Sequence, residues 1–302
     1  MKPTAILVSD LHIRETIPEC RKDDFMLAQE RKYAWLRELQ TKYDVPILVA
    51  GDVFHHWKPS PWLIGWTLRN LPDGIIAIPG QHDLTSHNLD MVEKTGIYVL
   101  AEAGKIELLT DSSVYNYNEL CIQGFPWGVE LTPATPCKSI QFPIALVHKL
   151  VYKGTPPFPG AENVGGTGKA LLKSMSGFDL ILTGDNHQTF TETLGESILV
   201  NPGSFTRQTA AQVDHQPSVF LWFAEDNTVE QVFVPINDAA VSREHLIVAE
   251  ERDERIDAFV TSLNKTVDLG ISFEENMIEI LAKNTVPKEV HTIIQGVLKD
   301  AA

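Results

Sequence analysis

The 302-residue sequence is poor in cysteine. Its three cysteines are Cys20, Cys121 and Cys137, and none of them belongs to a Cys-x-x-Cys pair. An odd number without that spacing indicates neither a disulfide framework nor a zinc ribbon. We therefore expect three reduced thiols.

Long apolar runs are also missing. No segment approaches the roughly 18 to 20 consecutive apolar residues that a membrane-spanning helix needs. The first residues, Met1 to Thr4, lead directly into a strand-like segment rather than into the apolar region of a signal peptide. We expect a soluble, cytoplasmic protein that does not cross a membrane.

Basic residues are few, with 25 lysines and arginines against 40 acidic residues and a net charge of -15. Proteins that coat nucleic acid by general electrostatic attraction are usually basic, so the composition argues against that class. Bound cations can still hold phosphate groups locally. A nucleic-acid enzyme therefore stays possible.

The first half of the chain alternates short β-branched runs with helical patterns. Strand-like runs cover residues 5–9, 46–50 and 74–78, and helical spacing of apolar residues covers 25–39 and 61–71. This order predicts parallel strands with helices packed outside them.

Strand-like runs lie closer together in the second half, which predicts hairpins and a mixed, two-sheet sandwich. The Gly- and Pro-rich stretch 152–169 is expected to be a long loop, and its ending, Gly165 to Lys169, lacks the spacing of a phosphate-binding loop. The strand-like runs cover residues 120–123, 144–148, 180–183, 198–200, 219–222 and 229–234.

The composition changes near Ser242. Three amphipathic stripes follow, and Ser272 with Glu275 forms a capping box before the second. We predict a catalytic domain over 1–241 and a small, mainly helical C-terminal appendage over 242–302. Its apolar stripes would pack on the catalytic domain or on another protein.

Residue types that bind metals follow the predicted strands, where α/β sheets present functional groups. Each motif alone has an ordinary explanation as a turn or a core histidine. Five of them in order, each at a strand end, predict one metal centre. They contain Asp10 and His12; Asp52; Gln81, His82 and Asp83; His148; and Asp185 and His187.

These motifs resemble the five motifs of the calcineurin-like metallophosphoesterases, over roughly residues 4–235. The resemblance implies an α/β fold, a metallophosphoesterase-type mixed two-sheet sandwich flanked by helices. Gly51 to His55, followed by Lys58-Pro59-Ser60, is similar to a narrower group. That group is the SbcD-type nuclease subunit of DNA double-strand-break repair complexes, which works with a coiled-coil ATPase.

The resemblance also implies roles for residues. His82 would contact the scissile phosphate, with Asp83 as its orienting partner. His55 would help to present the DNA backbone, or it is a solvated loop residue. One metal would be held by Asp10, His12, Asp52 and His187, and the other by Asp52, Gln81, His148 and Asp185.

Two positions depart from the family pattern, which usually has Asn at Gln81 and His at Asp185. An additional carboxylate favours a hard ion, Mn²⁺ or Mg²⁺, over zinc. The alternative is that the second metal site has been lost.

The expected function is a two-metal-dependent phosphoesterase, and specifically a Mn²⁺-dependent DNA nuclease with exonuclease or endonuclease action in DNA repair or recombination. Expected partners are DNA ends, a coiled-coil SMC-like ATPase and a second copy of the chain. One alternative is a small-molecule phosphodiesterase or protein phosphatase. Another is a catalytically silent metal-binding scaffold subunit.

Overall fold

The computed structural model describes residues 1–137, 141–244, 246, 277, 280–282, 287, 290–294 and 296. The chain divides into two units, Met1–Ser242 and Arg243–Ala302. Most of the second unit, including the predicted stripe at 256–263 and the capping box at Ser272, lies outside the described residues.

Two six-stranded sheets form the centre of the first unit. The first sheet has the order β14-β13-β1-β2-β3-β4, and the second has the order β11-β12-β10-β7-β6-β5. Both are mixed, because parallel strands are flanked by antiparallel ones. The first sheet consists of β1 (Ala5–Val8), β2 (Ile47–Val49), β3 (Ile75–Ala77), β4 (Ile106–Leu108), β13 (Ser218–Phe223) and β14 (Thr228–Phe233). The second consists of β5 (Val114–Tyr117), β6 (Leu120–Phe125), β7 (Phe142–His148), β10 (Leu180–Gly184), β11 (Phe190–Leu194) and β12 (Ser197–Asn201).

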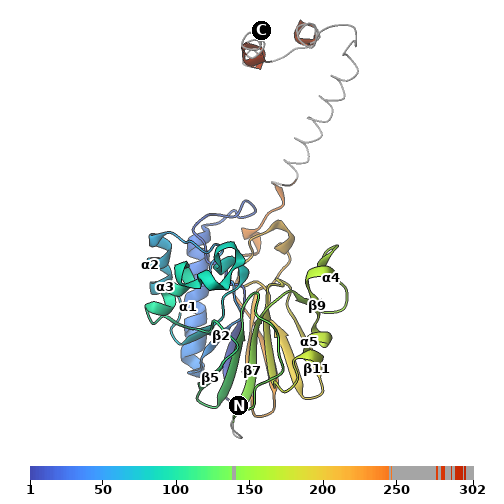
Figure 1. Ribbon diagram of the computed structural model, residues 1–302. Helices are drawn as coiled ribbons and strands as arrows, with labels where there is room; N and C mark the ends of the chain where they lie inside the picture. The colour runs from blue at the N-terminus through green and yellow to red at the C-terminus, as the bar shows by residue number, and fades with distance from the viewer. Residues whose placement is uncertain are drawn as a thin grey trace. The chain divides into compact units, whose positions relative to one another are not determined.

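Helices cover the two outer faces, with α1, α2 and α3 on one side of the sandwich and α5 on the other (Figure 1). The side chains of Asp24 and Ser60 accept hydrogen bonds at the N-termini of α1 and α2, which fixes where both helices begin. The helices are α1 (Phe25–Tyr43), α2 (Pro61–Asn70), α3 (Gly96–Glu102), α4 (Ala161–Val164) and α5 (Gly168–Ser174). Short elements complete the unit: a β8–β9 pair (Val151–Tyr152 and Gly166–Thr167) and the 3-10 turns η1 (Gln81–Asp83), η2 (Thr85–His87), η3 (Leu89–Lys94), η4 (Ala210–Gln212) and η5 (Asp238–Ala240).

The alternation of side chains along each strand separates the core into layers. Ile6 and Val8 of β1 pack toward the helices with Tyr33 of α1. Ala5 and Leu7 point the other way, into a cluster shared with β7 and β10 of the second sheet. Strands buried on both faces explain the continuous apolar runs in the sequence. The predicted helix-flanked, two-sheet α/β sandwich is therefore confirmed.

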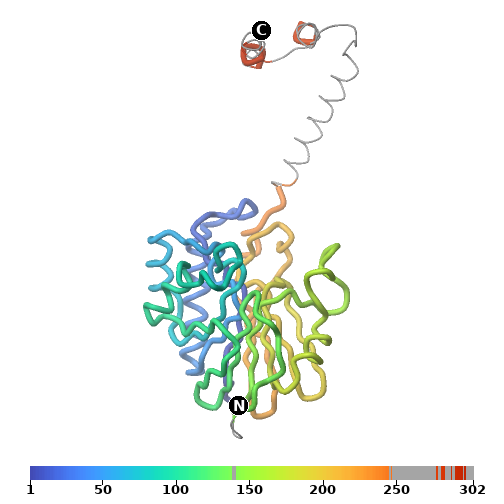
Figure 2. Tube along the Cα trace, in the orientation of Figure 1, coloured from blue at the N-terminus to red at the C-terminus, as the bar shows by residue number. Residues whose placement is uncertain are grey.

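The same topology brings the predicted motifs to one edge. β1, β2 and β3 are parallel neighbours, and so are β7 and β10. The segments that follow these strands lie at the end of the unit opposite the chain's N-terminus (Figure 2). Across the described residues, no helix has the length and apolar character to cross a membrane.

The prediction of three reduced thiols is wrong. Cys121 of β6 and Cys137 form a disulfide, and Cys20 is free and buried. Gln123 of β6 accepts a hydrogen bond from the backbone N–H of Thr135 (2.7 Å), which brings the loop that carries Cys137 beside the strand. This contact is long-range, so cysteine spacing could not reveal it.

The stretch 152–169 is only partly the long loop that was expected. It contains α4 and β9, and α5 begins at its end. The side chain of Thr167 accepts a hydrogen bond from the N–H of Ala170 and caps α5. Leu171 and Leu172 then bury one side of this helix against the second sheet.

Candidate metal centre

Four of the predicted ligands lie in backbone conformations that are unusual for residues with a side chain. Asp10, His12, Asp52 and Asp185 have φ values of 51°, 46°, 52° and 78°. The left-handed region costs an ordinary residue about 1 kcal/mol or more, so it persists only where surrounding contacts enforce it. Such strain gathers at functional sites, and here it turns side chains from separate strand ends toward one point.

Two glycines of the motifs are required by close packing. Gly51 has φ 89°, and a Cβ atom there would collide with the ring of His148. A Cβ atom at Gly80 would collide with the carboxylate of Asp52. The glycine of each motif therefore makes room for a ligand supplied by another motif.

The first group of converging side chains contains Asp10, His12 and His187. Their ligand atoms lie within 4.8 Å of one another. Nε2 of His12 is 3.0 Å from Nε2 of His187, and each lies 3.9 Å from Oδ1 of Asp10. Nε2 of His12 is also 3.6 Å from Oδ2 of Asp52. Burial lowers the pKa of both histidines, so their neutral rings can offer nitrogen lone pairs.

The second group is built around His148, whose Nδ1 donates to the carbonyl of Ala50 (2.6 Å). That bond makes Nδ1 a donor, so Nε2 is the ring nitrogen that can face a metal ion. Nε2 lies 3.5 Å from Oδ2 of Asp52 and 2.5 Å from Oε1 of Gln81. The amide of Gln81 is oriented by its other end, because Nε2 donates to Asp185 (2.6 Å). Two lone-pair atoms at 2.5 Å require a proton or a cation between them.

Asp52 lies between the two groups, and its carboxylate is not fully used by the protein. Oδ1 accepts a hydrogen bond from the backbone N–H of His82 (2.9 Å), whereas Oδ2 is buried and has no hydrogen-bond partner among the described residues. Oδ2 of Asp10 is buried in the same way. Burial favours the neutral form of Asp52, yet His148 and His12 hold its pKa below the ordinary value. Asp52 is therefore an anion facing both groups.

The pKa values of Asp10 and His148 are also shifted far from their ordinary values. Burial is the main cause that raises the pKa of Asp10, to about 8. Burial would lower the pKa of His148, but Asp52, Asp10 and Asp185 together raise it to about 10. Buried carboxylate oxygens without a hydrogen-bond donor are costly unless something satisfies them. The donor set of carboxylates, imidazoles and one amide fits divalent cations such as Mn²⁺.

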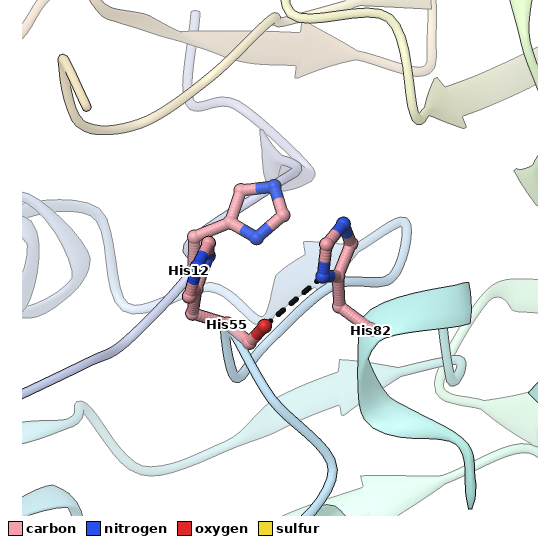
Figure 3. A group of neighbouring side chains, drawn as sticks. All are labelled: His12, His55 and His82. Carbon is pink, nitrogen blue, oxygen red and sulfur yellow. Dashed lines mark hydrogen bonds between the residues drawn. The ribbon is translucent and has the colours of Figure 1, made fainter. Parts of the chain in front are cut away.

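His82 and His55 lie beside His12 of the first group (Figure 3). Their rings stack with centroids 5.5 Å apart, and the ring of His82 lies edge-on to His12 at 4.9 Å. Nδ1 of His82 donates to the carbonyl oxygen of His55 (3.0 Å). Nε2 of His82 therefore remains available to a substrate.

His55 is held neutral. Burial, Arg14 and His82 lower its pKa to about 4. Its Nε2 lies 3.0 Å from Nη1 of Arg14, and because the guanidinium can only donate, Nε2 is the acceptor. His55 thus positions His82 and does not serve as an acid at neutral pH.

Asp83 differs from its expected role as the orienting partner of His82. Its buried carboxylate accepts hydrogen bonds from the backbone N–H groups of Val53, Phe54 and Gly80, at 3.1, 2.8 and 3.0 Å. It therefore ties the loop after β2 to the loop after β3. The carbonyl of His55 orients His82 instead, a backbone contact that residue types do not reveal.

Two residues near the centre were not expected from the sequence. One is Arg14, which stands two positions after His12 and whose Nη1 donates to Nε2 of His55. The ring of Trp127 lies edge-on to His148 with centroids 6.5 Å apart, and the backbone N–H of Trp127 donates to the carbonyl of Pro79. No local pattern identifies Trp127, because its loop follows a strand without a metal-ligand motif.

Solved structures with a similar fold have low sequence identity and modest structural agreement. An archaeal phosphodiesterase is 13% identical with a TM-score of 0.41, and the match covers 76% of this chain and 98% of that one. A protein from Staphylococcus aureus described as a candidate 5′-nucleotidase is 13% identical with a TM-score of 0.45, over 83% of this chain and 58% of its own. The sulfate thiohydrolase of Thermus thermophilus is 12% identical with a TM-score of 0.44, over 88% and 62%. No curated protein sequence matches the chain.

The family itself is identified by sequence. The model of the calcineurin-like phosphoesterases matches residues 4–189, which include β1, all five motifs and the strand ends that carry them. The same segments place carboxylates and imidazoles around Asp52. The chain belongs to the calcineurin-like phosphoesterases, a family of metal-dependent phosphoester hydrolases.

Proposed function

We propose that the chain is a Mn²⁺-dependent nuclease that acts on the ends of duplex DNA. Phosphoester hydrolysis follows from the family, and the convergence of side chains on Asp52 is the observation that carries the proposal. The narrower assignment is supported by the motif Gly51 to His55. It is also supported by the ring of His55, which stacks on the ring of His82.

Two overlapping sets of residues would hold the cations. In this proposal Asp52 belongs to both sets, which agrees with its place between the two histidine groups. Bound divalent cations supply the Lewis acidity that activates water and neutralises the charge of a phosphoester. The first set is Asp10, His12, Asp52 and His187, and the second is Asp52, Gln81, His148 and Asp185.

His82 would handle the proton. Its Nδ1–H is engaged by the carbonyl of His55, so the ring presents Nε2. From there it would donate a proton to the phosphate or to the departing oxygen, a role worth about 10² to 10⁴ in rate.

Mn²⁺ is the ion that this donor set favours in our proposal. Asp185 adds a third carboxylate beside Asp10 and Asp52, and Gln81 adds an amide oxygen. Hard oxygen donors favour Mn²⁺ or Mg²⁺ over zinc. Restoration of activity to metal-stripped protein by Mn²⁺, and less by Zn²⁺, is the expected result, whereas preference for Zn²⁺ would contradict this choice.

The net charge of -15 favours a second candidate, a small-molecule phosphodiesterase or protein phosphatase. Linear duplex DNA and bis-p-nitrophenyl phosphate, assayed side by side with Mn²⁺, separate the two. The nuclease cleaves both, whereas activity on the small ester alone refutes the nuclease. No activity on either substrate, with one bound ion per chain, would identify a metal-binding scaffold.

Partners of this proposed nuclease are a coiled-coil SMC-like ATPase and a second copy of the chain. The ATPase would bind the apolar stripes predicted within 242–302, which the sequence alone suggests. Co-purification of the full chain with such an ATPase, lost on truncation after residue 242, is the expected result. Light scattering of the purified chain tests the dimer, and a single-chain mass refutes it.

A further inference from the structure

A cavity outside the metal centre collects buried basic side chains. It has a volume of about 280 Å³ and lies between the beginning of α1, Arg207 and the segment 235–237 that follows β14. None of the predicted metal ligands lines it. Its charged lining residues are Arg21, Arg31, Lys32, Arg207, Asp23 and Asp24.

Lys32 is buried, with 6% of its surface exposed. An ammonium group has three N–H donors. Within the described part of the chain, its Nζ has one hydrogen-bond acceptor, the carbonyl of Phe205 at 2.7 Å, and no carboxylate partner. Its remaining donors are available to a ligand in the cavity.

Arg207 is 2% exposed and, like Lys32, has a hydrogen-bond donor that no described residue accepts from. Its Nη1 and Nη2 donate to the carbonyls of Val213 (3.0 Å) and Asn237 (2.6 Å). Its Nε is buried and has no partner among the residues that the structure describes. A buried guanidinium bonded only to neutral carbonyls keeps its full positive charge beside the cavity.

Arg21 contributes a third buried cation, but the carboxylate of Asp23 is paired with it. Its Nε and Nη2 donate to Asp23 at 2.8 and 2.7 Å, and its Nη1 donates to the carbonyl of Arg207. Asp24 is occupied as the cap of α1. The lining thus holds four basic side chains against two acidic ones, in a protein whose net charge is -15.

The pKa of Lys32 agrees with the lack, among the described residues, of a neighbouring carboxylate to pair with its ammonium group. Burial, then Arg21 and Arg207, lower its pKa to about 7, and Asp23 opposes this only in part. His215 also faces Lys32, and exposed Asp238 acts on Arg207. Buried charges are normally paired, and an anion in the cavity would provide the missing partner.

We propose that this cavity is a binding site for a tetrahedral oxyanion, a phosphate group, held by the ammonium of Lys32 and the guanidinium of Arg207. Charge-assisted hydrogen bonds to phosphate are the strong class that such buried donors form. The site does not depend on the proposed nuclease activity. It is coupled to the metal centre by Phe205, whose carbonyl accepts from Lys32 and whose N–H donates to the carbonyl of Asp10 (3.2 Å).

The test is calorimetric titration of the full chain, stripped of metals by chelation and dialysed, with inorganic phosphate and with adenosine monophosphate. K32M keeps the length of the side chain and removes the charge, and we expect it to weaken binding about tenfold or more. K105M is the matched control, because Lys105 is also largely buried but is paired with Asp73 away from the cavity. It should bind as the wild type does.

Sulfate provides a second measurement that needs no variant, since its charge is constant between pH 5 and 9. Binding to the wild type should weaken as pH rises through 7, where Lys32 loses its proton. Tighter binding of the nucleotide than of phosphate identifies a nucleotide ligand, and equal binding identifies free phosphate. Absence of binding by both anions, or equal binding by wild type and K32M, overturns the proposal.

Discussion

Replacement of His82 by asparagine separates proton transfer from metal binding. The backbone N–H of His82, not its ring, donates to Asp52, so this contact survives the substitution. An asparagine amide can also donate to the carbonyl of His55, which the ring of His82 contacts at 3.0 Å. What H82N removes is the ring nitrogen Nε2, the atom that we expect to deliver a proton.

The size of the effect follows from that single loss. A positioned general acid contributes about 10² to 10⁴ in rate. The predicted ligands are all retained in H82N, so metal affinity should change by less than about threefold, or roughly 0.7 kcal/mol. We therefore expect kcat to fall by at least about a hundredfold with two cations still bound.

The assay is hydrolysis of bis-p-nitrophenyl phosphate with Mn²⁺, combined with metal counting on the same samples. H56N is the matched control, because His56 is an exposed histidine in the loop after β2, next to His55. It should keep wild-type activity. Parallel loss of metal and activity in H82N, or full activity in H82N, would refute the role given to this ring.

Three other changes test separate parts of the structure. The pKa of Lys32 is about 7 in the folded protein and 10.5 ordinarily, so between these pH values the folded state binds fewer protons than the unfolded state. The free energy of unfolding of the wild type in anion-free buffer should therefore rise with pH across this window, by up to about 5 kcal/mol. Urea unfolding of K32M should lack this rise. C137S removes a disulfide that spans 16 residues, and in the absence of reductant it should lower the free energy of unfolding by about 3 kcal/mol. An equal urea midpoint for the wild type and C137S would contradict the presence of this disulfide. G51A places a Cβ atom against the ring of His148, at a residue with positive φ. Metal counting should then show the loss of at least one ion, and activity should fall more than about a hundredfold. An unchanged ion count would argue against the packing of Gly51 on a metal ligand.

Features with a local signal were predictable from the sequence. The apolar runs of β1, β2 and β3 and the helical spacing in α1 and α2 are periodic over short stretches, and the structure confirms all five. The motif residues could be placed together because parallel strands end at one edge of a sheet. Here local pattern and topology agree.

Features that depend on long-range contact were not predictable. The disulfide depends on Gln123 holding Thr135, the hydrogen bonds of Asp83 join two loops, and the basic cavity brings Arg207 beside Lys32 of α1. Arg21 and Arg207, which are 186 positions apart, meet in that cavity. Spacing carries no information about such pairs.

The most direct test of the central claim is a count of Mn²⁺ ions bound per chain, by mass spectrometry or calorimetry, in the wild type and in D52N. If Asp52 is shared between two cation sites, the wild type binds two ions and D52N loses affinity at both. A single ion in the wild type, or a D52N variant that still binds two ions as tightly as the wild type, would contradict the account.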